Sequence, residues 1–164
     1  MVVSVAGAEE ISAPRKLKIG VIVPLTGGVA TWGTSVRNPI EVTNAESENP
    51  AELLFEDEET CSATKALSAF RILQSVKNVD IIIASCLEGG QAIASLAKAS
   101  KLPFFISGRS SRDFQDRNPN ALSWLSLLDY EGEAIGKLIL EKKWNSGAAL
   151  VWMGYFGVQF ADGI

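Results

Sequence analysis

The sequence contains no histidine. This absence excludes Ser-His-Asp and Cys-His nucleophiles and every metal site built on imidazole ligands. The net charge is −4 and the chain has no basic cluster, so we expect neither nucleic acid nor an anionic membrane as a partner. No apolar run approaches the roughly 20 residues of a membrane-spanning helix, which argues against direct membrane insertion. An enzyme built from this chain would depend on carboxylates, Lys, Tyr or a cofactor.

What is present suits one globular domain. The 164 residues are 47% hydrophobic and 21% charged, a balance typical of folded rather than disordered chains. Residues 1–15 stand apart, because a short apolar run at 2–5 is followed by Ala-Gly-Ala at 6–8. This start fits either the tail of an export signal or a disordered N-terminus, and neither belongs to the fold.

Apolar runs alternate with helical patterns along the chain. Runs without polar alternation, such as KLKIGVIVP at 16–24, are typical of strands covered on both faces, and therefore of a parallel sheet. We predict strands at residues 17–23, 52–55, 79–84, 103–107, 121–126 and 148–153, and helices at 34–46, 62–77, 88–100 and 131–143, with a further helix beginning at 159–164.

This alternation predicts an α/β fold with a doubly wound parallel sheet in flavodoxin-like strand order. Right-handed crossovers place the second strand on one side of the first and the third on the other. The loops 24–33, 85–91 and 107–111 then share the carboxyl edge of the sheet, where ligands bind in such folds. The strand at 148–153 lacks a covering helix, so we expect the chain to be part of a longer protein.

These edge loops carry the candidate binding residues, each with a plain structural alternative. Trp32, in the Gly-rich first loop, can line a ligand or simply be buried in a turn, and this loop matches a flavodoxin phosphate loop only loosely. Arg109, Ser110 and Ser111 suit a carboxylate, or form an ordinary polar loop. The amides of 85–91 precede a helix and can bind the same group, or Gly89 and Gly90 simply form the entry to that helix.

Two further groups of residues, a pair of cysteines and an acidic run, each have two interpretations. Cys61 and Cys86 both follow strands and either form a disulfide or stay unpaired. The acidic run 56–59 is interpreted as a solvated rim rather than a metal site. Asp57 is not a receiver-domain phosphoacceptor, because residues 24–26 are Pro-Leu-Thr where that domain needs acids.

Several strings, taken in order, resemble a known family. KIGVIVPLTGGVATWG, LLFEDEETCSATKALSAFRIL, VDIIIASCLEGGQ, LPFFISGRSS and FADG are similar to the type I periplasmic solute-binding proteins of ABC transporters, in the leucine/isoleucine/valine-binding branch. The resemblance implies two lobes that close on a ligand. Residues 16–126 would form lobe one, and 127–164 a hinge crossing and an incomplete start of lobe two.

The resemblance also assigns roles to individual residues. It implies a disulfide between Cys61 and Cys86 and an exported protein. The implied ligand-binding residues are Trp32, Ser85, Leu87, Glu88, Arg109, Ser110, Ser111 and Tyr155, with Phe160 a second candidate from lobe two. Leu87 and Glu88 depart from the hydroxyl residues of the family, and Arg109 replaces a small residue, so a larger or more acidic ligand is one interpretation and different loop packing is another.

The implied function is solute binding in the periplasm or another extracytoplasmic location. The ligand would be an amino acid or related small carboxylate delivered to an ABC permease, with no cofactor, no metal and no catalysis. One alternative is a sensory receptor ectodomain of the same fold. An alternative of another class is a flavodoxin-like carrier or enzyme that binds FMN through the first loop and has two free thiols.

Overall fold

The computed structural model describes residues 15–123, 125–151 and 155–164, without the side chains of residues 155 and 156. The segment predicted as a leader therefore lies outside the described residues, except for Arg15. The C-terminal end of the strand predicted at 148–153 lies outside them as well.

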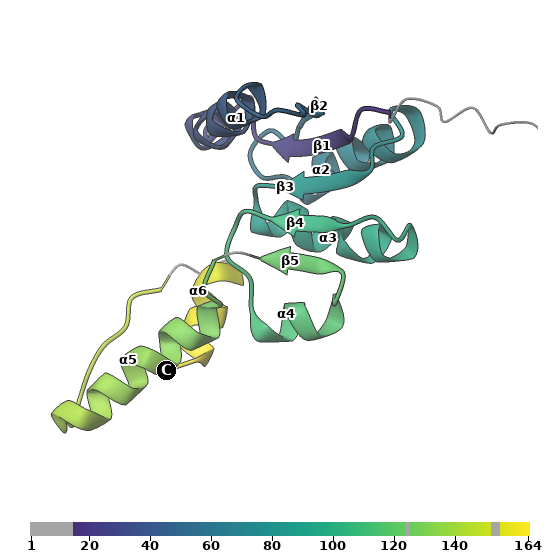
Figure 1. Ribbon diagram of the computed structural model, residues 1–164. Coiled ribbons are helices and arrows are strands. Elements are labelled where there is room, and N and C mark those ends of the chain that lie inside the picture. Colours follow the sequence, from purple (N-terminus) through teal and green to yellow (C-terminus); the bar gives the residue numbers. More distant parts are fainter. Residues whose placement is uncertain (1–14, 124, 152–154) are drawn as a thin grey trace, which may run out of the picture.

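A five-stranded parallel sheet forms the centre of the molecule (Figure 1). The strand order is β2-β1-β3-β4-β5, which confirms the predicted doubly wound arrangement. β1 lies between β2 and β3, with Val21 paired to Phe55 on one side and to Ile83 on the other. The strands are β1 (Lys18–Val23), β2 (Glu52–Asp57), β3 (Ile81–Ala84), β4 (Phe104–Ile106) and β5 (Ala121–Ser123).

Helices follow the strands in the predicted alternation, although several of their bounds differ from the prediction. The first helix begins at Ala30, earlier than predicted, and a short helix between β4 and β5 was not predicted at all. The helices are α1 (Ala30–Ala45), α2 (Ala63–Arg71), α3 (Leu87–Ala99), α4 (Arg112–Arg117), α5 (Leu128–Lys142) and α6 (Tyr155–Asp162), and a π-helical turn, η1 (Ile72–Val76), extends α2.

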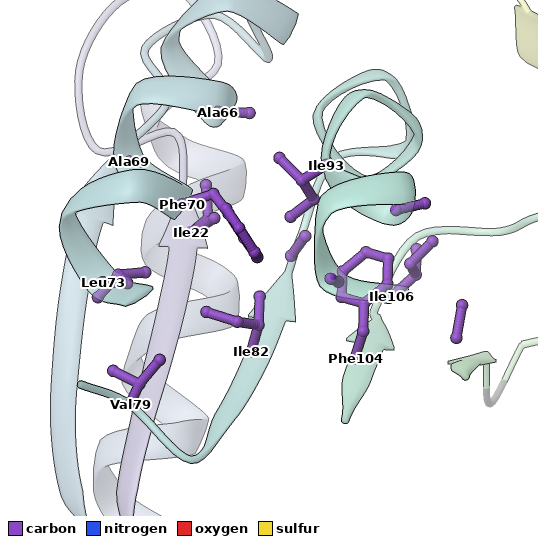
Figure 2. Close-up of a cluster of buried hydrophobic side chains, with 14 of the residues drawn as sticks. Ile22, Ala66, Ala69, Phe70, Leu73, Val79, Ile82, Ile93, Phe104 and Ile106 are labelled. Atoms are coloured by element: carbon purple, nitrogen blue, oxygen red, sulfur yellow. The ribbon is translucent and has the colours of Figure 1, made fainter. Parts of the chain in front are cut away.

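The main core lies between the sheet and the helices α2 and α3 (Figure 2). Ile22, Ile82 and Phe104 project from three neighbouring strands and are fully buried against Phe70 of α2 and Ile93 of α3. Burial of each such side chain contributes on the order of 1.5–3 kcal/mol. This packed core fixes the sheet against α2 and α3, and with it the positions of the strand ends.

On the opposite face, α1 runs beside β1 and crosses the end of that strand closely. An ideal Cβ at Gly33 would lie only 1.9 Å from the carbonyl oxygen of Pro24. Glycine at this position therefore allows the first loop to fold back over the end of β1.

We expect Gly33→Ala to lower the free energy of unfolding by about 2 kcal/mol or more, since the clash is with backbone that cannot rotate away. Gly28 is the matched control, because nothing lies within 4 Å of a Cβ there. Urea denaturation of both variants measures the difference. Equal stability of the two would contradict this account of Gly33.

The C-terminal part extends away from the sheet as a pair of packed helices, α5 and α6 (Figure 1). Glycines allow the close approach, because a Cβ at Gly132 would lie 2.4 Å from the carbonyl oxygen of Phe160. The predicted strand at 148–153 is wrong for its described part, since residues 148–151 are in no strand. The final helix begins at Tyr155, not at the predicted residue 159.

Candidate functional site

The ends of four neighbouring strands, β2, β1, β3 and β4, are aligned by backbone hydrogen bonds that continue the sheet. Glu58 N–H donates to Val23 O at 3.1 Å, Ser85 N–H to Ile22 O at 3.0 Å, and Ser107 N–H to Ala84 O at 2.9 Å. These bonds keep the first residue after each of β2, β3 and β4 at the level of the sheet edge. The loops therefore leave the sheet side by side.

A disulfide joins two of these loops. Cys61 and Cys86 are bonded, with their Cα atoms 5.5 Å apart. The backbone of Cys61 adopts a left-handed conformation, with φ of 60°, which turns the chain after β2 toward β3. The predicted pairing is confirmed, whereas the flavodoxin-like alternative expected two free thiols.

A pocket of about 280 Å³ opens beside the disulfide. It contains five of the eight predicted ligand-binding residues, although they come from three separate segments of the chain, including the first turns of α1 and α3. Its lining consists of Trp32, Cys61, Ser85, Cys86, Leu87, Glu88, Ser107, Gly108, Arg109 and Leu125.

The pocket combines an apolar wall with a small polar end. Trp32 is 47% exposed and Leu125 40% exposed, so both offer apolar surface to a ligand. The hydroxyl of Ser107 is buried and has no hydrogen-bond partner among the described residues. α3 begins at Leu87, and no side chain of its own N-cap residue, Cys86, caps it. The first N–H groups of a helix have no partner within the helix, and together with the Ser107 hydroxyl they suit an anionic group.

Ser110 and Ser111 are placed elsewhere. Both side chains are fully buried, and neither lines the pocket. Ser110 Oγ accepts a hydrogen bond from the side-chain amide of Gln115, at 3.1 Å. Ser111 is the N-cap of α4, where its Oγ accepts from Phe114 N–H at 3.2 Å. Tyr155 begins α6, and its side chain lies outside the described residues.

Arg109 lines the pocket but already has a carboxylate partner. Its Nη1 forms an ion pair with Glu131 of α5. The other oxygen of Glu131 accepts a hydrogen bond from the hydroxyl of Ser126. Glu131 occupies Nη1 of the Arg109 guanidinium. A bidentate pair between Arg109 and a ligand carboxylate would therefore have to use the other guanidinium nitrogens.

The first loop is held by a carboxylate rather than shaped to receive a phosphate. Asp57 accepts hydrogen bonds from Leu25 N–H at 2.7 Å and from the Thr26 hydroxyl at 2.5 Å. Burial alone would raise the pKa of Asp57, but the hydrogen bonds from Thr26, Glu59 and Leu25 outweigh it and lower the pKa. The donors of Leu25 and Thr26 at the start of the loop are therefore committed to an acid and are not available to a phosphate.

The acidic run is a solvated rim, as predicted, at Glu56 and Glu59 but not at Glu58. Glu56 and Glu59 form surface ion pairs with lysines. Glu58, in contrast, is fully buried beneath the start of α3, where an ideal Cβ at Gly89 would lie 2.0 Å from its Oε2. Burial raises the pKa of Glu58 to about 7, partly offset by hydrogen bonds from Ser85 and from the backbone of Cys86.

Sequence reasoning missed two residues that this geometry makes prominent, Ser107 and Glu58. Ser107 follows β4 directly, as Ser85 follows β3, and this equivalence was a usable signal. Glu58 carried no such signal, because four consecutive acids do not reveal which of them turns inward.

In the described part of the chain, no cluster of three or more acidic or sulfur-containing residues is arranged to hold a metal ion. No helix there has the length and apolarity required to cross a membrane.

Comparison with protein-family models and with curated proteins finds no match to this sequence. Solved structures do share the fold. A solute-binding protein of an ABC transporter from Rhodopseudomonas palustris, in complex with 3,4-dihydroxybenzoic acid, aligns with a TM-score of 0.77 at 20% identity, over 90% of this chain and 44% of that one. A second one from R. palustris, in complex with 4-hydroxybenzoate, has a TM-score of 0.80 at 18% identity, over 91% and 42% of the two chains.

A branched-chain amino acid transporter substrate-binding protein from Streptococcus pneumoniae, in complex with isoleucine, aligns with a TM-score of 0.65 at 17% identity, over 78% of this chain and 39% of that one. The chain thus spans less than half the length of these proteins. The likeness establishes the fold, which is that of a lobe of the type I periplasmic binding proteins of ABC transporters.

Proposed function

We propose that this chain contributes one wall of the ligand cleft of an extracytoplasmic solute-binding protein that delivers a small carboxylate to an ABC permease. The ligand class comprises amino acids and aromatic carboxylates. Residues 16–126 act as lobe one, and residues 127–164 as the crossing and the beginning of lobe two. The protein binds its ligand and does not transform it.

The observation that carries this proposal is the composition of the pocket at the sheet edge. Trp32, Leu87 and Leu125 supply an apolar surface for the body of a small molecule. The start of α3 and the unpartnered Ser107 hydroxyl supply donors for a carboxylate. Apolar walls with a few convergent polar groups are typical of small-molecule sites.

An amino-acid ligand and an aromatic acid place different demands on this pocket. The carboxylate is common to both and requires the donors at the end of β4 and the start of α3. An aromatic ring additionally gains from stacking on Trp32, whereas an α-ammonium group needs an acceptor, and Glu88 is the acid that lines the pocket. Both types of ligand are therefore included in the test.

We expect Trp32→Ala to weaken binding of 4-hydroxybenzoate by roughly five- to ten-fold, since an aromatic contact contributes about 1 kcal/mol beyond area burial. Trp144→Ala is the matched control, because Trp144 is 59% exposed just after α5 and does not line the pocket. Saturation-transfer NMR titrations with 4-hydroxybenzoate and with isoleucine measure the affinities. If the wild-type chain binds neither compound, or if the two tryptophan variants behave alike, the proposal is wrong.

A further inference from the structure

Glu58 lies directly behind the ligand pocket without being exposed to it. Its carboxyl is fully buried between the end of β2 and the start of α3. One oxygen, Oε1, accepts a hydrogen bond from the hydroxyl of Ser85 at 3.3 Å. The other, Oε2, has no hydrogen-bond partner among the described residues. A buried carboxylate with an unpaired oxygen is costly, whereas the neutral acid form avoids the cost of the buried charge.

Ser85 connects this carboxyl to the pocket. It is 1% exposed and belongs to the pocket lining. A hydroxyl has one proton, which it donates to one acceptor at a time. When Glu58 is ionised, the Ser85 proton is directed at Oε1, and only oxygen lone pairs remain for a ligand. The second nearby acceptor, Cys86 Sγ at 3.8 Å, is weak.

We propose that Glu58 is a positioning residue that makes carboxylate binding proton-linked by setting the direction of the Ser85 hydroxyl. In its acid form, Glu58 donates its own proton to Ser85 Oγ. The Ser85 proton is then free to point into the pocket and donate to an anionic ligand. Binding of a carboxylate therefore takes up one proton when it starts from the ionised form. This inference rests on the proposed function.

The charges around Glu58 favour this behaviour. Asp57, next to it at the end of β2, and Glu88, on the first turn of α3, are both acidic and raise its pKa, in addition to the larger effect of burial. On the α2 side, Lys65 is paired with Glu59. Across the pocket, Arg109 is paired with Glu131. The nearest charges are thus negative, and the acid form is populated near neutral pH.

The test measures the affinity for 4-hydroxybenzoate at about pH 6 and about pH 8, a range in which its carboxylate stays ionised. For the wild type we expect affinity to fall about ten-fold between the two conditions, as for any site that requires one proton on a group titrating near neutrality. The neutral analogue 4-hydroxybenzamide serves as the ligand control. Because it carries no carboxylate, we expect its affinity to change far less.

Three variants separate this mechanism from others. Glu58→Gln carries a permanent N–H donor toward Ser85, so we expect it to bind at the acid-side affinity at both pH values. Ser85→Ala removes the hydroxyl, so we expect binding at the weak, alkaline-side affinity throughout. Glu59→Gln is the matched control, since Glu59 pairs with Lys65 at the surface, and it keeps the wild-type pH dependence.

The possible outcomes distinguish failure of the proton-linked role of Glu58 from failure of the proposed solute-binding function. If the wild-type affinity does not change with pH, the inference fails while the proposed function stands. If Ser85→Ala retains the full pH dependence, the charge on Glu58 acts directly and the hydroxyl relay is wrong. If neither the wild type nor Glu58→Gln binds 4-hydroxybenzoate or isoleucine at any pH, the proposed function is wrong and the inference falls with it.

Discussion

Reduction of the Cys61–Cys86 disulfide is expected to lower the free energy of unfolding by about 3–4 kcal/mol. The bond closes a loop with a sequence separation of 25, and the chain-entropy estimate for a loop of that length gives this magnitude. The loop includes β3 and all of α2, so its closure restricts a large part of the unfolded chain.

Guanidinium denaturation with and without a thiol reductant measures this loss. The double variant Cys61→Ser/Cys86→Ser, examined without reductant, controls for effects of the reductant itself. We expect the variant and the reduced wild type to agree. A loss below about 1 kcal/mol in both would show that the disulfide adds little to stability, contrary to the entropic account.

Reduction is also expected to weaken ligand binding. Both cysteines line the pocket, and the bond holds the loop after β2 against the start of α3. Release of this loop removes one wall of the pocket and loosens the packing around Glu58. The same samples, titrated with 4-hydroxybenzoate, report this second effect.

Glu58→Gln is expected to stabilise the protein at alkaline pH by up to about 3 kcal/mol. Burial, the largest cause, raises the pKa of Glu58 from 4.5 to about 7. Between those values the folded state keeps a proton that the unfolded state loses, so wild-type stability falls as pH rises through this window. Above it, the full cost of the buried charge remains.

Urea denaturation at several pH values tests this assignment. The wild type is expected to lose stability from about pH 4.5 to about pH 7, and Glu58→Gln to show a flatter profile. Asp57 and Asp80 act in the opposite sense and at lower pH, because their pKa values are lowered, so they do not mask the effect. Glu59→Gln should follow the wild type, and an equal slope in Glu58→Gln would refute the buried-carboxylate account.

The strands were the most predictable part of the fold. Ile19–Val23 and Ile81–Ala84 consist of apolar residues in unbroken succession, and such runs are stable only inside a covered parallel sheet. The strand order followed from the handedness of crossovers. Local sequence was sufficient because the first rule depends on the apolar pattern of each run and the second on the intrinsic handedness of the chain.

The strand predicted at 148–153 is wrong for its described residues, because a strand needs a partner. Residues 148–151 have the apolar composition of a strand, yet the described sheet ends at β5, and none of its strands pairs with them. The composition of a segment indicates that it favours burial, but not whether the edge of another strand is available to pair with it. The helix α4 was missed for a related reason, since its six residues show too little periodicity to be recognised.

The structure brings some, but not all, of the residues predicted as ligand contacts into one pocket. The three loops meet as topology requires, and Trp32, Ser85 and Arg109 all reach one pocket. The hydroxyls of Ser110 and Ser111 were expected there, but the sequence did not show that α4 begins at Arg112 and uses Ser111 as its cap. The serines that line the pocket are Ser85 and Ser107 instead.

The most direct test of the central claim is an amide-correlation NMR titration of the isotope-labelled chain with 4-hydroxybenzoate and with isoleucine. This measurement detects weak binding and locates it on individual residues. We predict that at least one compound shifts the Trp32 indole and the amides of Leu87, Glu88 and Ser107, while Trp144 stays unchanged. No shifts with either compound, or shifts concentrated away from this pocket, would contradict the account.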